Sequence, residues 1–141
     1  MKVVIDTSIW SVVMRRDNAK LNPLELVWKS EFVDLFHANR IALIEPVRQE
    51  LLSGVRHEKQ YQKLKKGLRG YTPEPLFSED YEEAAVIHNK CLSHGYVPYS
   101  IDCLICAVTL LRGWQLFTAD KDFIRFKDII GLGLYECRRS Q

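Results

Sequence analysis

The spacing of hydrophobic positions changes several times along this chain, and each change indicates a different element. Lys2 to Ile5 is an apolar run without polar alternation, which is typical of a strand buried on both faces of a parallel sheet. Other short apolar runs predict strands at 41–44, 115–118 and 132–137. Between the strands, apolar residues recur with helical spacing, and this spacing predicts helices at 7–14, 24–38, 46–55, 57–69, 78–94, 101–112 and 123–126.

Cap residues support these helix boundaries. Asn22 and Pro23 suit the cap and the first position of the helix at 24–38, and Gly95 suits the end of the helix at 78–94. The helix at 101–112 is apolar nearly all round, so we expect it at the centre of the fold. Strands separated by helices predict an α/β fold, with a short parallel β-sheet flanked by α-helices.

Composition narrows the class of protein. The 141 residues suit one domain over 1–141, and 47% hydrophobic with 27% charged residues is ordinary for a globular protein. A net charge of +2 is too small to argue for a nucleic-acid partner by itself. Without a signal peptide or an apolar run of membrane-spanning length, a cytoplasmic protein with no membrane association is expected.

One stretch of the chain is strongly basic. Residues 56–69 carry six Lys and Arg side chains opposed only by Glu58. A solvated helix face explains such a run, and so does a surface that contacts phosphates. On the second interpretation, Lys63, Lys66 and Arg69 are candidates for contact with RNA.

Cysteine and histidine offer two further candidate sites. Cys103 and Cys106 have the spacing of a redox or zinc pair, but they lie in a strongly apolar segment where free cysteine behaves as a small hydrophobe. His88, Cys91 and His94 stand three residues apart, close to metal-ligand spacing. No second pair elsewhere completes a zinc finger.

Four acidic residues fall where strands end or helices begin. Asp6 and Asp120 follow predicted strands, and Asp102 lies in the first turn of the central helix. Glu50 lies one turn into the helix at 46–55, where helical spacing predicts it on the side of Val47 and Leu51. Each has a structural alternative: Asp6 could cap a helix, Asp102 could complement a helix dipole, and Glu50 could pair with a nearby cation. In open α/β sheets, however, the carboxyl ends of strands border the ligand crevice.

Four carboxylates in one crevice repel each other unless a cation lies among them. Mg²⁺ suits sparse carboxylates, because it binds one or two of them, keeps several waters and leaves room for a substrate phosphate. A pair of such ions supports phosphodiester cleavage. The acids therefore predict a metal-dependent hydrolase.

Four segments of the chain also carry a family resemblance. They are Asp6-Thr7-Ser8 after a hydrophobic strand, Pro46 to Leu51 with Glu50, Tyr99 to Ala107 with Asp102, and Thr118 to Phe123 with Asp120 and Asp122. In this order, within a match from Lys2 to about Glu136, they resemble the PIN-domain ribonucleases. The closest likeness is to the VapC toxins of bacterial and archaeal VapBC toxin–antitoxin modules.

The resemblance implies a PIN-like fold in which Asp6, Glu50, Asp102 and Asp120 form the catalytic, metal-binding quartet. Asp122 is a fifth candidate metal ligand that stands apart from the quartet, because the regular acid of the family pattern falls at Asp120 and the next acid varies. The hydroxyls of Thr7, Ser8 and Thr118 would orient the acids or a phosphate, cap helices, or do both. The resemblance further implies Mg²⁺- or Mn²⁺-dependent cleavage of RNA (tRNA or rRNA), a homodimer and inhibition by a VapB-like antitoxin.

Two other functions compete with a toxin ribonuclease. A phosphatase of the haloacid dehalogenase type also begins with an apolar strand and Asp, but it usually has a second acid two residues later, where this chain has Ser8. A catalytically inactive PIN-like module that binds RNA or protein is the alternative outside the enzymes. Four clustered acids argue against it, because a pure binding module has no need of repelling charges.

Overall fold

The centre of the molecule is a parallel sheet of three short strands. The computed structural model describes residues 1–138. Strand β1 (Val3–Ile5) lies between β2 (Ile41–Ala42) and β3 (Gln115–Phe117), giving the order β2-β1-β3. Val3, Val4 and Ile5 are all 0% exposed, which confirms that β1 is buried on both faces. Because all pairings are parallel, the carboxyl ends of β1 and β3 reach the same edge.

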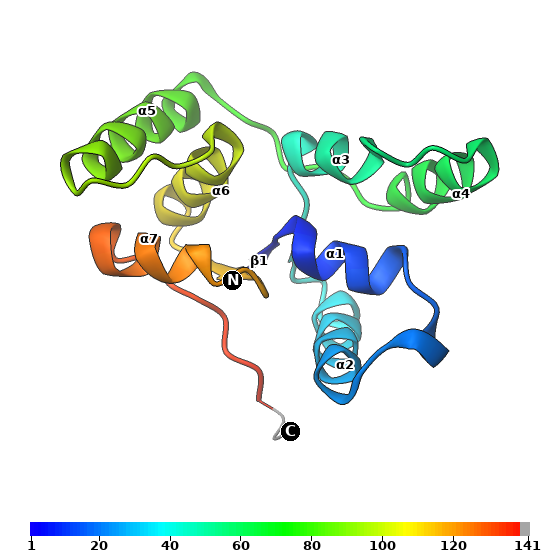
Figure 1. The fold of residues 1–141 in the computed structure, drawn as a ribbon. Coiled ribbons are helices and arrows are strands. Elements are labelled where there is room, and N and C mark those ends of the chain that lie inside the picture. Colours follow the sequence, from blue (N-terminus) through cyan, green and yellow to red (C-terminus); the bar gives the residue numbers. More distant parts are fainter. Residues whose placement is uncertain (139–141) are drawn as a thin grey trace.

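Helices lie on either side of this sheet, with α1 to α4 on one side and α5 to α7 on the other (Figure 1). Their bounds are α1 Thr7–Met14, α2 Pro23–His37, α3 Glu45–Leu52, α4 Glu58–Leu68, α5 Ser78–Ser93, α6 Ser100–Leu111 and α7 Asp122–Ile130, with a short 3₁₀ turn at Asn18–Lys20. This arrangement confirms the predicted α/β fold. Within residues 1–138, no helix is both long and apolar enough to cross a membrane.

Local sequence explains several helix positions. Asn22 and Glu25 form a capping box at the start of α2, because the Asn22 side chain accepts from the Glu25 amide at 2.8 Å and Glu25 accepts from the Asn22 amide at 3.1 Å. In α1, Trp10 is 0% exposed and packs edge-on against Phe32 and Tyr71. Helix α6 is buried over most of its length, as its all-round apolar pattern predicts.

Other expectations need correction. The strand predicted at 132–137 is absent from the described chain except for one parallel bridge between Leu116 and Leu134. Gly131, at φ +72°, ends α7, and Gly133 follows two residues later, so the backbone here cannot extend a regular ladder. Helix α3 ends at Leu52 rather than at residue 55, because Ser53 leaves the helical conformation and Gly54 adopts φ +84°.

The segment after α7 is fastened to α2 by a buried carboxylate. Glu31 is 0% exposed and accepts hydrogen bonds from the Tyr135 hydroxyl at 3.0 Å and the Arg138 amide at 2.7 Å. These bonds satisfy a charge that would otherwise be costly to bury. They hold the C-terminal segment next to β3, where the Tyr135 amide donates to the Leu116 carbonyl at 2.8 Å.

Candidate active site

Asp6 is placed where β1 passes into α1. Its backbone still belongs to the sheet, since the Asp6 amide donates to the Phe117 carbonyl at 3.0 Å, while its side chain caps α1. The side chain is almost fully buried, at 4% exposed. Burial raises the pKa of Asp6 above its usual value, although bonds from Ser8 and Thr118 oppose the shift. The sequence left open whether Asp6 caps a helix or lies at the edge of the sheet, and in the structure it does both.

Two hydroxyls join Asp6 to the segment that follows β3. Ser8 Oγ and Thr118 Oγ1 each donate to Asp6 Oδ2 at 2.8 Å. Each hydroxyl oxygen in turn accepts a backbone amide, Ser8 Oγ from Ala119 at 2.9 Å and Thr118 Oγ1 from Asp120 at 3.0 Å. Because both hydroxyl protons point at Asp6, the network favours the ionised carboxylate. It also fixes the backbone of Asp120 relative to Asp6.

Asp102 is the acid whose pKa is affected by the charges of the other four. It lies in the first turn of α6 and is half-buried. Its pKa is raised to about 7 by burial first, and then by the negative charges of Asp6, Asp120, Glu50 and Asp122. The structure therefore brings together all five acids that the sequence singled out. The Asp122 amide also donates to Asp120 Oδ1 at 2.9 Å, which orients the Asp120 carboxylate.

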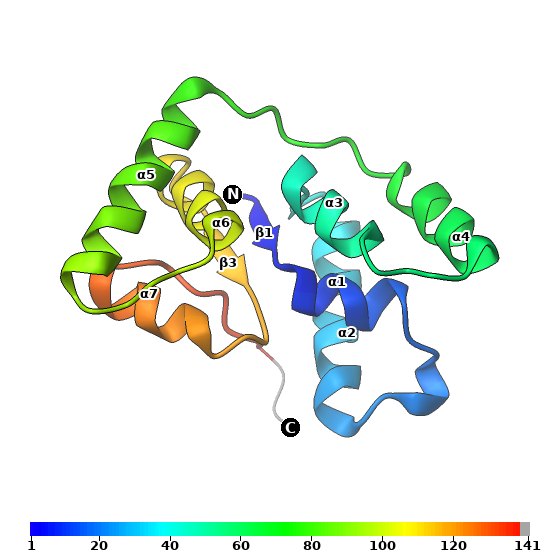
Figure 2. The ribbon, with the colours of Figure 1, turned by 45° about the horizontal axis from the view of Figure 1, so that its top comes forward.

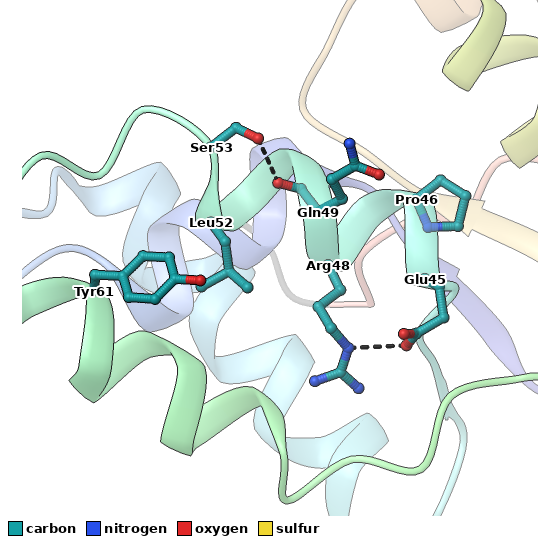
Figure 3. Close-up of a pocket in the computed structure, with 7 residues that line it drawn as sticks. All are labelled: Glu45, Pro46, Arg48, Gln49, Leu52, Ser53 and Tyr61. Carbon is teal, nitrogen blue, oxygen red and sulfur yellow. Dashed lines mark hydrogen bonds and ion pairs between the residues drawn. The ribbon is translucent and has the colours of Figure 1, made fainter.

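Glu50 reaches this group from α3, and it is exposed rather than turned toward the apolar side of the helix. The sequence placed it beside Val47 and Leu51, which are both buried. Figure 3 shows another face of α3, which carries Arg48. The Nε of Arg48 donates to Glu45 at 2.8 Å. Arg48 also donates to the Tyr71 carbonyl at 3.4 Å, so α3 is tied to the connector behind it.

Tyr96 and Arg125 border the acids, and the sequence did not single them out. The Arg125 guanidinium lies 4.8 Å from the centroid of the Tyr96 ring. Burial raises the pKa of Tyr96, with smaller contributions from the charges of Asp122 and Asp102. The one available signal was the spacing of Arg125, three residues after Asp122, which places both on one side of α7.

The acids fit hard divalent cations better than a zinc cage. In the part of the chain that the structure describes, no three His, Cys, Asp or Glu side chains form a ready-made set of metal ligands. Mg²⁺ and Mn²⁺ need only a few carboxylates and complete their coordination with water. The pKa of Asp102 is raised by burial and, to a smaller extent, by the negative charges of the other acids, and a cation bound among them would offset both effects.

The other candidate sites do not assemble. Cys91 is fully buried, whereas His94 is exposed with Nδ1 2.9 Å from the Lys90 carbonyl, so the His88, Cys91 and His94 side chains do not converge. Cys103 and Cys106 are buried in the core of α6. Burial raises the pKa of Cys103 to about 11 and that of Cys106 further, which keeps both thiols protonated and unreactive.

Comparison with known families identifies the family of the chain. The model of the PIN domain family matches residues 3–129. The chain belongs to the PIN domain family. The match covers the full set of acids, from Asp6 to Asp122, and it confirms the family that the sequence motifs resembled.

Among curated proteins, this PIN domain is similar to two named ribonucleases. It is 29% identical over 125 residues to "VapC ribonuclease Mb1587" of Mycobacterium bovis, which covers 86% of this chain and 88% of the relative. It has the same identity and coverage with "Ribonuclease VapC11" of Mycobacterium tuberculosis.

Solved structures share the fold of this PIN domain. The structure of VapBC2 from Rickettsia felis bound to a promoter DNA fragment matches with a TM-score of 0.71 and 19% identity, over 96% of this chain and 98% of that chain. FitAcB from Neisseria gonorrhoeae matches with a TM-score of 0.73 and 16% identity, over 98% and 99%. At these identities the likeness supports the fold.

Proposed function

We propose that the protein is a metal-dependent endoribonuclease that acts as the toxin of a type II toxin–antitoxin system. The observation that carries the proposal is the placement of the acids: Thr118 joins Asp6 to the Asp120 backbone at the edge of the sheet, and the charges of Asp6, Asp120, Glu50 and Asp122 act on Asp102. Clustered carboxylates at the edge of a parallel sheet suit the binding of a cation beside a phosphate. The PIN family and the relatives named as ribonucleases point to RNA as the substrate.

The acids and the hydroxyl residues of the site have separate roles in this proposal. Asp6, Asp102, Asp120 and Glu50 would hold Mg²⁺ or Mn²⁺, with Asp122 as a fifth ligand. A bound cation supplies positive charge that stabilises the charge developing on the phosphodiester during hydrolysis. The bonds from Ser8 and Thr118 favour the ionised form of Asp6 and orient its carboxylate, and Thr118 holds the Asp120 backbone in place. The phosphodiester belongs to a cellular RNA, with tRNA and rRNA as the candidates.

Two protein partners belong to the same proposal. The solved structures that share the fold include VapBC complexes, which supports a VapB-like antitoxin as the partner that restrains the enzyme. A homodimer is supported by exposed apolar side chains on and after α5, with Tyr81 54%, Val97 75% and Tyr99 76% exposed.

Cleavage of total cellular RNA by the purified protein tests the function. Wild-type protein should cut RNA in Mn²⁺ or Mg²⁺ and stop when EDTA is added, and Asp6→Asn should not cut. Asp128→Asn is the matched control, because it removes an exposed acid of α7 that is not among the charges acting on Asp102. Cutting that survives both chelator and Asp6→Asn would contradict the metal mechanism. RNA binding without cutting would favour the inactive PIN-like module.

A further inference from the structure

A basic cleft lies at the end of α1 that is distant from Asp6. It has a volume of about 910 Å³ and is lined by residues of the last turn of α1, of the segment after it, and of the chain from Gly54 into α4. Figure 2 shows that the backbone leading into α4 passes beside the end of α1. Its charged lining consists of Arg15, Arg16, Lys20, Arg56, Lys63 and a single acid, Asp17. The cleft therefore brings two basic parts of the sequence together, one after α1 and one within the stretch 56–69.

Most of this positive charge is not neutralised by the protein. Arg16 is paired with Glu25, but Arg15, Lys20, Arg56 and Lys63 enter none of the ion pairs found within residues 1–138. The neighbouring cleft between α3 and α4, of about 540 Å³, is different because its one cation, Arg48, is bound to Glu45 (Figure 3). An excess of cations around one cleft favours an anionic ligand.

The position of the cleft connects it to the acidic site. Helix α1 begins next to Asp6 and has eight residues, so its ends are about 12 Å apart. Helix α3 carries Glu50, and the residues just after it, Gly54 and Val55, line the cleft. Two elements that bring acids into the site thus end at the basic cleft. At about 3.4 Å per stacked nucleotide, 12 Å corresponds to about four nucleotides, and to fewer in an extended strand.

We propose that this cleft binds backbone phosphates of the RNA strand a few nucleotides away from the phosphate that is cut. The inference rests on the proposed ribonuclease function and adds the surface that holds the substrate. RNA fits better than an acidic peptide, because a strand with one phosphate at the acidic site carries further phosphates that can reach the cleft along the length of α1. Val13, Val55 and Leu64 also line the cleft and offer apolar contact to sugars and bases.

The structure provides a matched control for this surface. Arg56 and Lys63 line the cleft, whereas Lys90 of α5 and Lys127 of α7 are exposed basic residues that do not line it and that the sequence did not single out for RNA contact. The variants Arg56→Gln/Lys63→Gln and Lys90→Gln/Lys127→Gln remove the same charge. All four side chains are exposed, so neither variant disturbs the core.

Binding is measured in the cleavage-deficient Asp6→Asn background, by fluorescence anisotropy with a fluorescein-labelled single-stranded RNA of 20 nucleotides and mixed sequence. We expect the cleft variant to bind about tenfold more weakly than the Asp6→Asn parent at low salt. The slope of log K against log[salt] should fall by about 1.4, since each lost phosphate contact contributes about 0.7 for single strands. The control variant should bind within about twofold of the parent. Equal weakening by both variants, or none by the cleft variant, would overturn the proposal.

Cleavage by the same variants in the wild-type background separates this proposal from the proposed function. A KM that rises in the cleft variant alone, at unchanged kcat, supports both. If wild-type protein cuts no RNA but the cleft variant still binds RNA more weakly than the control, the ribonuclease function fails and the cleft assignment stands. If cleavage and RNA binding are normal in the cleft variant while its inhibition by a co-expressed antitoxin is lost, the cleft belongs to a protein partner and the proposal is overturned.

Discussion

The Thr118 hydroxyl donates to Asp6 Oδ2 at 2.8 Å and accepts from the Asp120 amide at 3.0 Å. One side chain thus fixes two acids that are separated by more than a hundred residues in the chain but adjacent at the sheet edge. The Ser8 hydroxyl repeats the arrangement between Asp6 and the Ala119 amide. The acids at the ends of β1 and β3 are therefore positioned as a pair.

Thr118→Val should reduce cleavage and Mn²⁺ affinity by about 10- to 100-fold, the range typical of groups that orient metal ligands. The substitution keeps the shape of the side chain but removes the hydroxyl that orients Asp6. Thr118→Ser restores the hydroxyl and should recover most of the activity. Titration calorimetry with Mn²⁺ and cleavage rates for the three proteins check this. Equal losses in the Val and Ser variants would point to packing instead.

Asp102→Asn should abolish cleavage yet stabilise the metal-free protein. Its carboxylate is ionised at the cost of burial and repulsion, so the neutral amide should raise the free energy of unfolding by about 1–2 kcal/mol in EDTA at pH 8, after allowance for screening. The gain should grow as pH rises from about 4 to about 7, because the unfolded carboxyl ionises near 3.8 and the folded one at about 7. Urea unfolding at several pH values measures it. A less stable variant at pH 8 would contradict the repulsion.

Asp120→Asn should cost far more activity than Asp122→Asn. Asp120 contributes more than Asp122 to the raised pKa of Asp102, and its backbone is held by Thr118. We expect a loss of at least 100-fold for Asp120→Asn and less than tenfold for Asp122→Asn, measured as initial cleavage rates at saturating Mn²⁺. Similar losses in both variants would make Asp122 a full member of the site.

Asp80→Asn should destabilise the protein by about 3 kcal/mol at neutral pH, because it breaks a buried ion pair. Asp80 is 2% exposed and accepts from Arg112 Nη1 at 2.7 Å, and this bond lowers the pKa of Asp80 below 3.8. A lowered pKa means that the stabilisation is present above about pH 4 and is lost as pH falls through the folded pKa. Urea unfolding at pH 7 and pH 3 should show the difference between wild type and variant shrinking in acid. Glu79→Gln, which alters an exposed neighbour, should show no such effect.

The sequence predicted the order of helices and strands, because each buried face repeats its apolar residues with the period of its element. It predicted the strand at 132–137 wrongly, since Leu132 and Leu134 are apolar but follow Gly131 and flank Gly133, which limit pairing to one bridge. The spacing of apolar residues predicts which side chains are buried, but it does not predict whether a segment forms the backbone hydrogen bonds of a strand.

For the site, strand ends and helix starts were enough to predict that Asp6, Asp102 and Asp120 meet. The spacing of Glu50 suggested the apolar side of α3, yet its side chain is exposed while Val47 and Leu51 are buried, because an ionised carboxylate is costly to remove from water. The basic cleft could not be predicted from the stretch 56–69 alone. Its other half follows α1, and only the packing of α1 against α4 brings Arg15 near Arg56.

The order of strands determines how late in synthesis the cluster of acids can form. Strand β1 is made first but occupies the centre of the sheet, and its partner β3 is made more than a hundred residues later. A ribosome-bound chain that ends before Thr118 lacks the hydroxyl and the acid that complete the edge beside Asp6. The nascent protein therefore cannot assemble its cluster of acids until translation has passed residue 120, and a chain that terminates before that residue should be harmless to the cell that makes it.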